Sequence, residues 1–253
     1  FVTYPSTVKG QKTRKTAPSF KDHFSQARLF WNSMSLIEKS HIIQAFSFEL
    51  GKVKSVSVRQ QVVNMLGRIS TELAAQVARE LEVDAPNVQE SQVTKSSPAL
   101  SMANTKFLPN TLRIGVIVAE GYNGQSTQYI LNQLIQAGLQ PVIINDRLGT
   151  VKGTNGVEYK VDDSFLTGSP LLYDGLYIVG GQEENDYSLR KTITFVVEAY
   201  NHFKPIGASR GGATIIGSLG LKGKPGVIIE HNPTTFSYEF IAAMTKQRFW
   251  ERA

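Results

Sequence analysis

The stretch Lys204-Pro-Ile-Gly-Ala-Ser-Arg-Gly-Gly-Ala-Thr-Ile-Ile216 decides the fold of this chain. It begins with a short apolar run, Pro205 to Ala208, which is typical of a buried strand. A sharp turn at Ser209-Arg210 follows, and Gly211-Gly212 opens a helix. A strand that turns abruptly into a helix lifts the turn residue above the sheet edge and points the helix N-terminal N–H groups at whatever binds there. The stretch therefore predicts an elbow in an α/β sheet, with Ser209 at its tip.

A serine at such an elbow acts as a nucleophile when a base lies within about 2.6–3.2 Å of it. The chain has four histidines, and His231 is the one expected at the same sheet edge, because it follows a predicted strand over 226–230. Glu230 beside it is expected to point the opposite way if both residues lie in the strand. Serine is also a preferred helix N-cap, and we favour the interpretation that Ser209 caps the helix.

The composition limits the classes of protein that remain. The length of 253 residues exceeds one average domain, so two units are expected. The hydrophobic content of 41% suits a soluble globular protein, and no run of about 18 apolar residues predicts a membrane span. The absence of cysteine excludes disulfides, thiolate metal sites and a cysteine nucleophile, and leaves the cellular compartment open. The acidic residues Glu183, Glu184 and Asp186 are interpreted as a solvated loop rather than as a metal site.

Charge is uneven along the chain. Residues 1–110 carry a net charge of +6, and residues 111–253 carry none. A basic segment can bind nucleic acid. Here, however, residues such as Lys9 and Arg14 lie in a Pro-, Thr- and Ser-rich stretch without interleaved aromatic residues. We therefore expect an extended, solvated or partner-wrapping arm over 1–20, and no nucleic-acid partner.

Residues 21–83 have the apolar periodicity of four helices. Ser35 and Glu38 form a capping box that opens the second one. The predicted apolar faces, in chain order, hold Phe24, Phe30 and Trp31; Leu36, Ile43, Phe46, Leu50 and Val53; Val58, Val62, Met65, Leu66 and Ile69; and Leu73, Ala74, Val77, Ala78 and Leu81. Each helix is apolar on one face alone, so the helices must pack on one another or on a partner.

Residues 84–110 are rich in proline and serine and have no period, which predicts a long linker. Residues 111–253 then alternate between strands and helices, which predicts a doubly wound, mostly parallel sheet. Strands are expected over 112–119, 141–145, 174–181, 205–208 and 226–230, with an Asn155-Gly156 hairpin turn between the second and the third. A helix expected to bury Tyr129, Ile130, Leu134 and Ile135 follows the first strand. Any ligand crevice should lie at the carboxyl ends of the strands.

The order of these pieces resembles a known family. Phe24-Ser-Gln-Ala-Arg-Leu-Phe30, Met34-Ser-Leu-Ile-Glu-Lys39, Ala45-Phe-Ser-Phe-Glu-Leu50 and Leu73-Ala-Ala-Gln-Val-Ala78 resemble the helical domain of large-subunit haem catalases. The α/β unit is similar to their C-terminal flavodoxin-like domain, which belongs with PfpI-like and class I glutamine amidotransferase-like proteins. The resemblance spans about residues 20–253.

The resemblance implies a C-terminal fragment. The family's catalytic residues and its haem-binding tyrosine belong to an upstream β-barrel, so we expect neither haem binding nor peroxide decomposition by this chain. It also aligns Ser209 with the cysteine of PfpI-like elbows and places Ser126 near their glutamate. Both functional groups are then missing, which gives a degenerate elbow of Ser209, Arg210, Gly211 and Gly212, with His231 as a base only if the elbow is active.

Three hypotheses follow. The leading one is a stabilising, chaperone-like (holdase) module that binds unfolding client proteins, associates with its own barrel in the parent catalase and forms homo-oligomers. Its candidate client-binding residues are Phe24, Phe30, Trp31, Phe46 and Phe48, because exposed apolar patches bind other apolar surfaces, and some of the five are expected to belong to the core. The alternatives are a purely structural module that stabilises a tetramer and a PfpI-like hydrolase that uses Ser209.

Overall fold

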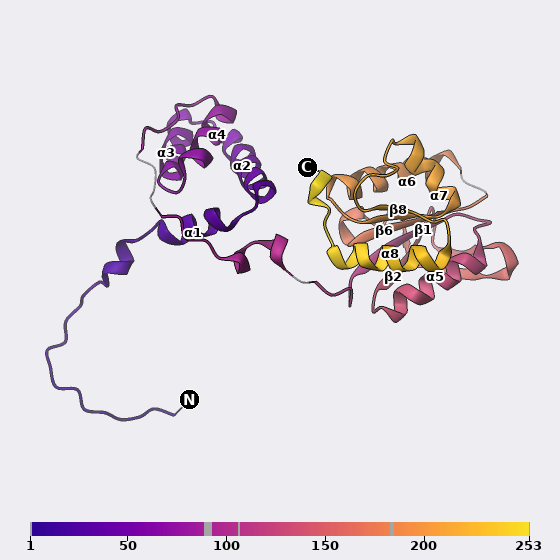
Figure 1. Ribbon diagram of the computed structural model, residues 1–253, viewed down its shortest axis with the longest axis horizontal. Coiled ribbons are helices and arrows are strands. Elements are labelled where there is room, and N and C mark those ends of the chain that lie inside the picture. Colours follow the sequence, from indigo (N-terminus) through magenta and orange to yellow (C-terminus); the bar gives the residue numbers. More distant parts are fainter. Residues whose placement is uncertain (1, 89–92, 106, 183–184, 253) are drawn as a thin grey trace. The chain divides into compact units, whose positions relative to one another are not determined.

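The computed structural model describes residues 2–88, 93–105, 107–182 and 185–252, so Glu183 and Glu184 of the predicted acidic loop lie outside the described residues. The chain divides into two compact units, Phe1–Thr105 and Lys106–Ala253, which are described separately below (Figure 1). Within these described ranges, none of the helices has the length and apolar character needed to cross a bilayer.

The first unit is built from four helices. After a 3-10 turn at Pro18–Lys21, these are α1 (Ser25–Ser33), α2 (Leu36–Gly51), α3 (Val56–Gly67) and α4 (Thr71–Leu81). Helix α4 packs against both α2 and α3, and its whole predicted apolar face is buried. The core also contains Trp31, Ile43, Leu50, Val63 and Leu66. The periodicity of the sequence therefore predicted the helices. The central position of α4 follows from its apolar face, all of which is buried against its neighbours.

The predicted faces of the other helices are only partly correct. Leu36 and Phe46 on α2, and Val58 and Met65 on α3, are exposed, although all four belong to the predicted stripes. Helices α2 and α3 contact α4 along only part of their surface, so an apolar residue outside that contact stays exposed. The periodic pattern of the sequence predicts an apolar face but does not set how wide the contact is.

The capping box of α2 also holds down part of the predicted linker. The Glu38 carboxylate accepts hydrogen bonds from Ser35 N and Oγ, both at 2.8 Å, and the Ser35 hydroxyl accepts one from Glu38 N. The Glu38 carboxylate also accepts hydrogen bonds from Ser101 Oγ at 2.8 Å and from Met102 N at 2.9 Å. Ser101 lies between the short 3-10 turns Pro98–Leu100 and Met102–Asn104, and Met102 begins the second of them. One carboxylate thus ties the start of a helix to a segment more than sixty residues further along the chain.

The second unit contains a six-stranded sheet in the order β5-β2-β1-β6-β7-β8, and every strand pair in it is parallel. Its strands are β1 (Arg113–Val118), β2 (Gln140–Asn145), β5 (Asp163–Ser164), β6 (Gly175–Gly180), β7 (Ile206–Ala208) and β8 (Val227–Ile229). A separate antiparallel hairpin, β3 (Gly149–Lys152) and β4 (Glu158–Val161), turns at Asn155 and Gly156, both with positive φ, as the Asn-Gly pair predicted.

Helices cover both faces of this sheet (Figure 1). α5 (Gly124–Gln136) and α8 (Pro233–Lys246) pack on one face, where Val116 and Tyr177 point. α6 (Asp186–Asn201) and α7 (Arg210–Ser218) pack on the other, against residues such as Ile178 and Ile206. The doubly wound flavodoxin-like prediction is therefore confirmed. On α5, Ile130 and Leu134 are buried as predicted, but Tyr129 and Ile135 are exposed, because the buried face is shifted towards Thr127 and Leu131.

The elbow depends on a very close approach between two glycine pairs, Gly180-Gly181 at the end of β6 and Gly211-Gly212 in the first turn of α7. Gly180, with φ of +71°, ends β6, and a Cβ built on it would lie 2.8 Å from the Gly211 backbone. A Cβ on Gly212 would lie 2.3 Å from the Ile178 carbonyl oxygen. Real Cβ atoms essentially never come so close to backbone atoms. The backbone of the first turn of α7 therefore contacts the backbone of the end of β6 directly. A side chain at Gly180 or Gly212 would prevent this contact.

We predict that Gly212→Ala destabilises the α/β unit by about 3 kcal/mol or more, because the backbone of β6 must move to admit the methyl group. Gly217→Ala is the matched control on the same helix, since nothing lies within 4 Å of a Cβ there. This control should gain about 0.5–1 kcal/mol from the better helix propensity of alanine. Thermal unfolding followed by circular dichroism measures both; equal effects of the two substitutions would contradict the close approach.

A second prediction concerns acid stability of the helical unit. Burial raises the pKa of Glu38, but its hydrogen bonds from Ser35, Ser101 and Met102 outweigh this effect and leave the pKa below the ordinary value of 4.5. A carboxyl group with a lowered folded pKa contributes stability above its unfolded pKa and loses it as the pH falls through the folded pKa. The melting temperature of the helical unit should therefore fall below about pH 4.5, and Glu38→Gln should flatten that fall. An unchanged pH profile in the variant would contradict the assignment.

Candidate functional site

The carboxyl ends of the parallel strands form the natural site of this fold. The strand order reverses between β1 and β6, and ligands of open α/β sheets bind at such a reversal. A cavity of about 340 Å³ lies there, which we call the elbow cavity. Its wall includes Ser126 at the start of α5, Gly180 and Gly181 after β6, and Ser209 and Gly211 at the elbow; Glu230 and His231 also line it. Of the predicted elbow residues, the structure thus brings together Ser209, Gly211 and the candidate base His231.

Ser209 lies at the tip of the elbow, between β7 and α7, as predicted. Its hydroxyl, however, donates a hydrogen bond of 2.9 Å to the Val179 carbonyl oxygen and does not bond to the first N–H groups of α7. The prediction of a capping hydroxyl is therefore wrong. Ser209 holds the N-cap position, but its side chain is directed down to the end of β6 because the glycine pairs bring that strand so close.

The candidate base, His231, makes no hydrogen bond to the Ser209 hydroxyl in the described structure. His231 lines the elbow cavity with an exposed side chain, and no hydrogen bond joins it to Ser209 among the described residues. The run Gly207-Ala-Ser-Arg-Gly211 does carry the Gly-x-Ser-x-Gly spacing of hydrolase elbows. Spacing is thus compatible with a nucleophile, and the geometry of the hydroxyl is what argues against one. The side chain of Arg210 lies outside what the structure describes.

The carboxylate of Glu230 also lines the cavity, beside the elbow, because Glu230 N donates a hydrogen bond of 2.8 Å to the Ala208 carbonyl oxygen. β8 ends at Ile229, so Glu230 and His231 both follow the strand and both line the cavity. The expectation that Glu230 points the opposite way applied only if both residues lay in the strand, and that condition is not met. Glu230 Oε1 accepts a hydrogen bond of 2.9 Å from Ser126 Oγ. A long-range contact of this kind between residues 104 positions apart has no signal in the sequence.

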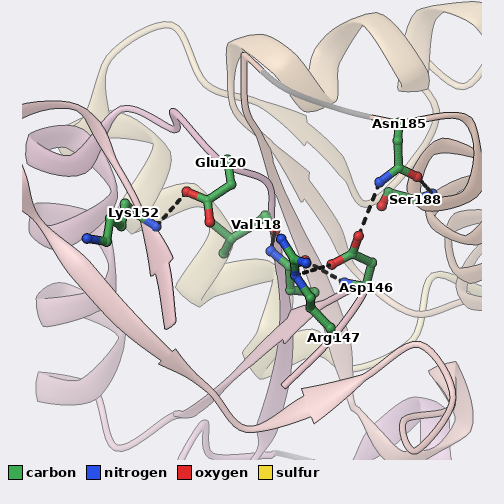
Figure 2. A network of polar contacts seen from close by, with 8 residues as sticks. Val118, Glu120, Asp146, Arg147, Lys152, Asn185 and Ser188 are labelled. Carbon is green, nitrogen blue, oxygen red and sulfur yellow. Dashed lines mark hydrogen bonds and ion pairs between the residues drawn. The ribbon is translucent and has the colours of Figure 1, made fainter. Parts of the chain in front are cut away.

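A second cavity, of about 320 Å³, lies on the other side of β1, between the ends of β1 and β2 and the start of α6. Figure 2 shows its polar network. Glu120 accepts from Lys152 N at 2.9 Å, and Asp146 accepts from Asn185 Nδ2 at 3.1 Å. Asn185 in turn caps α6 by accepting from Ser188 N at 2.9 Å. Both carboxylates therefore fasten the hairpin and α6 to the sheet edge, which is a structural task.

The helical unit has a cavity of a different kind, a groove of about 330 Å³ with purely apolar walls. We call it the apolar groove; its residues are Ala27, Phe30, Trp31, Ile42, Ala45, Phe46, Ile69 and Leu73. Phe30 is 47% exposed and Phe46 is 37% exposed, whereas Trp31 is 4% exposed. Of the five candidate client-binding aromatics, the structure thus places Phe30, Trp31 and Phe46 on one surface.

The remaining two candidates lie outside the apolar groove. Phe24 is partly buried, and the Arg68 guanidinium lies 4.2 Å from its ring centre. Phe48 is 66% exposed, and the Lys52 ammonium lies 3.8 Å from its ring centre. Cations over these rings leave less apolar surface free for a partner.

The fold and its sites define a class: a flavodoxin-like α/β unit whose elbow serine has no engaged base, together with a four-helix unit that carries an apolar groove. Comparison with known proteins identifies the family. Residues 110–253 match the family described as the C-terminal domain found in long catalases, and residues 17–81 match the family described as catalase-related immune-responsive.

Curated relatives match along the whole chain. It is 45% identical over 252 residues to a catalase of Alkalihalophilus pseudofirmus, 38% identical to catalase-2 of Bacillus subtilis, and 35% identical to catalase HPII of Mycobacterium avium. Each match covers 100% of this chain but 37% of the first two relatives and 38% of the third. The chain belongs to the family of long catalases and contains their C-terminal domain.

Catalases hold haem iron through a tyrosine, whose oxygen must be free to face the iron. The fully buried tyrosines described in this chain, Tyr122, Tyr173 and Tyr177, are instead enclosed in the packed cores of the α/β unit. The hydroxyls of Tyr122 and Tyr173 are moreover bonded to Val157 O and to Asp163, at 2.8 and 2.7 Å. These residues do not fit a haem group. No cluster of three His, Asp or Glu suited to a metal ion occurs among the residues described.

The geometry of Ser209 predicts that a fluorophosphonate probe forms no covalent adduct with the chain, since the hydroxyl is engaged with Val179 and lacks a base. Ser209→Ala should cost about 1 kcal/mol of unfolding free energy, the typical contribution of one such hydrogen bond. Intact-mass spectrometry and chemical denaturation measure the two effects. A stoichiometric adduct that disappears in Ser209→Ala and in His231→Ala would contradict this account.

Proposed function

We propose that this chain is the stabilising and chaperone-like part of a long catalase, a holdase module that performs no peroxide chemistry of its own. The parent protein decomposes hydrogen peroxide at a haem held elsewhere in its chain. The observation that carries the proposal is the apolar groove of the helical unit, where Phe30 and Phe46 keep large exposed surfaces.

The apolar groove suits weak and promiscuous binding. Its walls present no polar surface, so a client needs no matching hydrogen-bond pattern, only apolar side chains of adequate size. Burying a phenylalanine that was fully exposed stabilises a contact by about 1.5–3 kcal/mol. Phe30 and Phe46 are partly exposed and therefore contribute less than that each, which gives affinities low enough for release.

The state of the elbow supports a non-enzymatic role for the second unit. Its serine is engaged with Val179, and its candidate base, His231, makes no hydrogen bond to it within the part of the chain that the structure describes. The same apolar groove also suits the alternative of a purely structural module, in which the parent's barrel or a neighbouring subunit covers it. The two roles differ in one respect: a structural module protects no foreign protein.

Light scattering of a heat-labile client protein tests the proposal. The chain should suppress aggregation at a few-fold molar excess, and a variant with both Phe30→Ser and Phe46→Ser should lose most of that suppression. Phe48→Ser is the matched control, because Phe48 lies on the same helix as Phe46 and is 66% exposed but lies outside the apolar groove. It should behave as the unmodified chain does.

Circular dichroism must first show that all variants are folded. Absence of suppression by the unmodified chain would contradict the holdase role and favour the structural one. An equal loss in Phe48→Ser and in the double variant would mean that general surface hydrophobicity, rather than the apolar groove, binds the client.

A further inference from the structure

Two arginines border one end of the apolar groove, and we call them the arginine pair: Arg28 on α1 and Arg68 at the C-cap of α3. Arg28 Nε donates a hydrogen bond of 2.8 Å to the Arg68 carbonyl oxygen. The two guanidinium groups lie 5.9 and 4.2 Å from the ring centre of Phe24. Phe24 precedes the groove residue Ala27 by three positions, so both lie on one face of α1, and Arg68 directly precedes the groove residue Ile69. The arginine pair therefore lies next to the wall of the apolar groove.

The arginine pair differs from the other cations that lie over aromatic rings in the helical unit. Lys39 lies 5.0 Å from the ring centre of Trp31. It is compensated by Glu72, whose carboxylate lies 3.9 Å from the ammonium group. Lys52, which also lies over a ring, pairs with Glu49 at 3.0 Å. By contrast, neither guanidinium of the arginine pair forms an ion pair with any carboxylate of the described residues.

The acidic residues closest to the arginine pair in the sequence are engaged elsewhere. The Asp22 carboxylate accepts a hydrogen bond of 3.0 Å from Ser25 N, and Glu72 pairs with Lys39. A guanidinium group presents its N–H donors in a planar fork that matches a carboxylate. An apolar surface with arginine at its rim also has the composition of a protein-binding interface. The apolar groove and the arginine pair together suit a partner that brings both apolar side chains and carboxylates.

We propose that the apolar groove selects client segments in which aspartate or glutamate lies next to a run of apolar side chains. The apolar side chains fill the groove, and the adjacent carboxylates meet the arginine pair. This inference rests on the holdase role of the groove and adds a charge preference to it. A segment with lysine or arginine beside its apolar run is disfavoured, because like charges across an interface repel and exclude wrong partners.

Fluorescence anisotropy with the 253-residue chain tests the charge preference. The probes are labelled peptides that share one apolar core of leucine and phenylalanine and are flanked by aspartates, by glutamines or by lysines. The aspartate peptide should bind about fivefold more tightly than the lysine peptide, with the glutamine peptide between them. Salt at about 1 M should remove most of this difference, because it screens exposed charges. Equal binding of all the peptides would overturn this inference and leave the holdase role intact. Binding of none of them, as expected if a second copy of the chain covers the groove, would overturn both.

Matched charge reversals locate the preference. Arg68→Glu should abolish the difference between the aspartate and lysine peptides, and the exposure of Arg68 makes loss of the fold an unlikely cause, which circular dichroism checks. Arg14→Glu changes the net charge by the same amount on the exposed arm and should leave the difference unchanged. The double variant Phe30→Ser and Phe46→Ser should weaken binding of every peptide, because both residues line the groove. An unchanged preference in Arg68→Glu, or an equal loss in Arg14→Glu, would overturn the assignment to the arginine pair.

Discussion

The close contact between the end of β6 and the first turn of α7 governs the chemistry of the α/β unit. Because Gly180 and Gly212 have no side chains, the two backbones approach to distances that no Cβ tolerates. The elbow therefore lies close to the end of β6. The Ser209 hydroxyl donates its hydrogen bond to the Val179 carbonyl oxygen, and it neither bonds to His231 nor caps α7. A motif that presents a nucleophile in other proteins here acts as a joint between strand and helix.

The same contact explains what remains open at the cavity. Because the Ser209 hydroxyl bonds to Val179, the first N–H groups of α7 receive no side-chain cap from the N-cap residue, and they lie at the carboxyl ends of the strands. In the helical unit, the corresponding open feature is apolar: α4 takes up the main faces of α2 and α3, and Phe30 and Phe46 are left partly exposed over the apolar groove. Each unit thus keeps one surface feature that its own side chains leave exposed.

The sequence predicted what depends on local periodicity and spacing. The four helices, the capping box at Ser35, the Asn155-Gly156 turn and the parallel sheet all follow from patterns within about twenty residues. It did not predict features that depend on distant partners. The exposure of Leu36, the direction of the Ser209 hydroxyl and the Ser126–Glu230 hydrogen bond are set by residues far away in the chain. Likewise, the Arg252 guanidinium donates a hydrogen bond of 2.9 Å to the Lys204 carbonyl oxygen, and no local pattern around either residue predicts this contact.

The claim that the elbow is a structural joint can be tested at one atom, because the chain has no cysteine of its own. In Ser209→Cys, the introduced thiol is the only one, and its alkylation rate by iodoacetamide reports how far position 209 is presented to the cavity. A thiol directed at Val179 should react at least about a hundredfold more slowly in the folded chain than in the urea-unfolded chain. A folded-state rate equal to or above the unfolded one would contradict the account and reinstate the elbow as a nucleophile site.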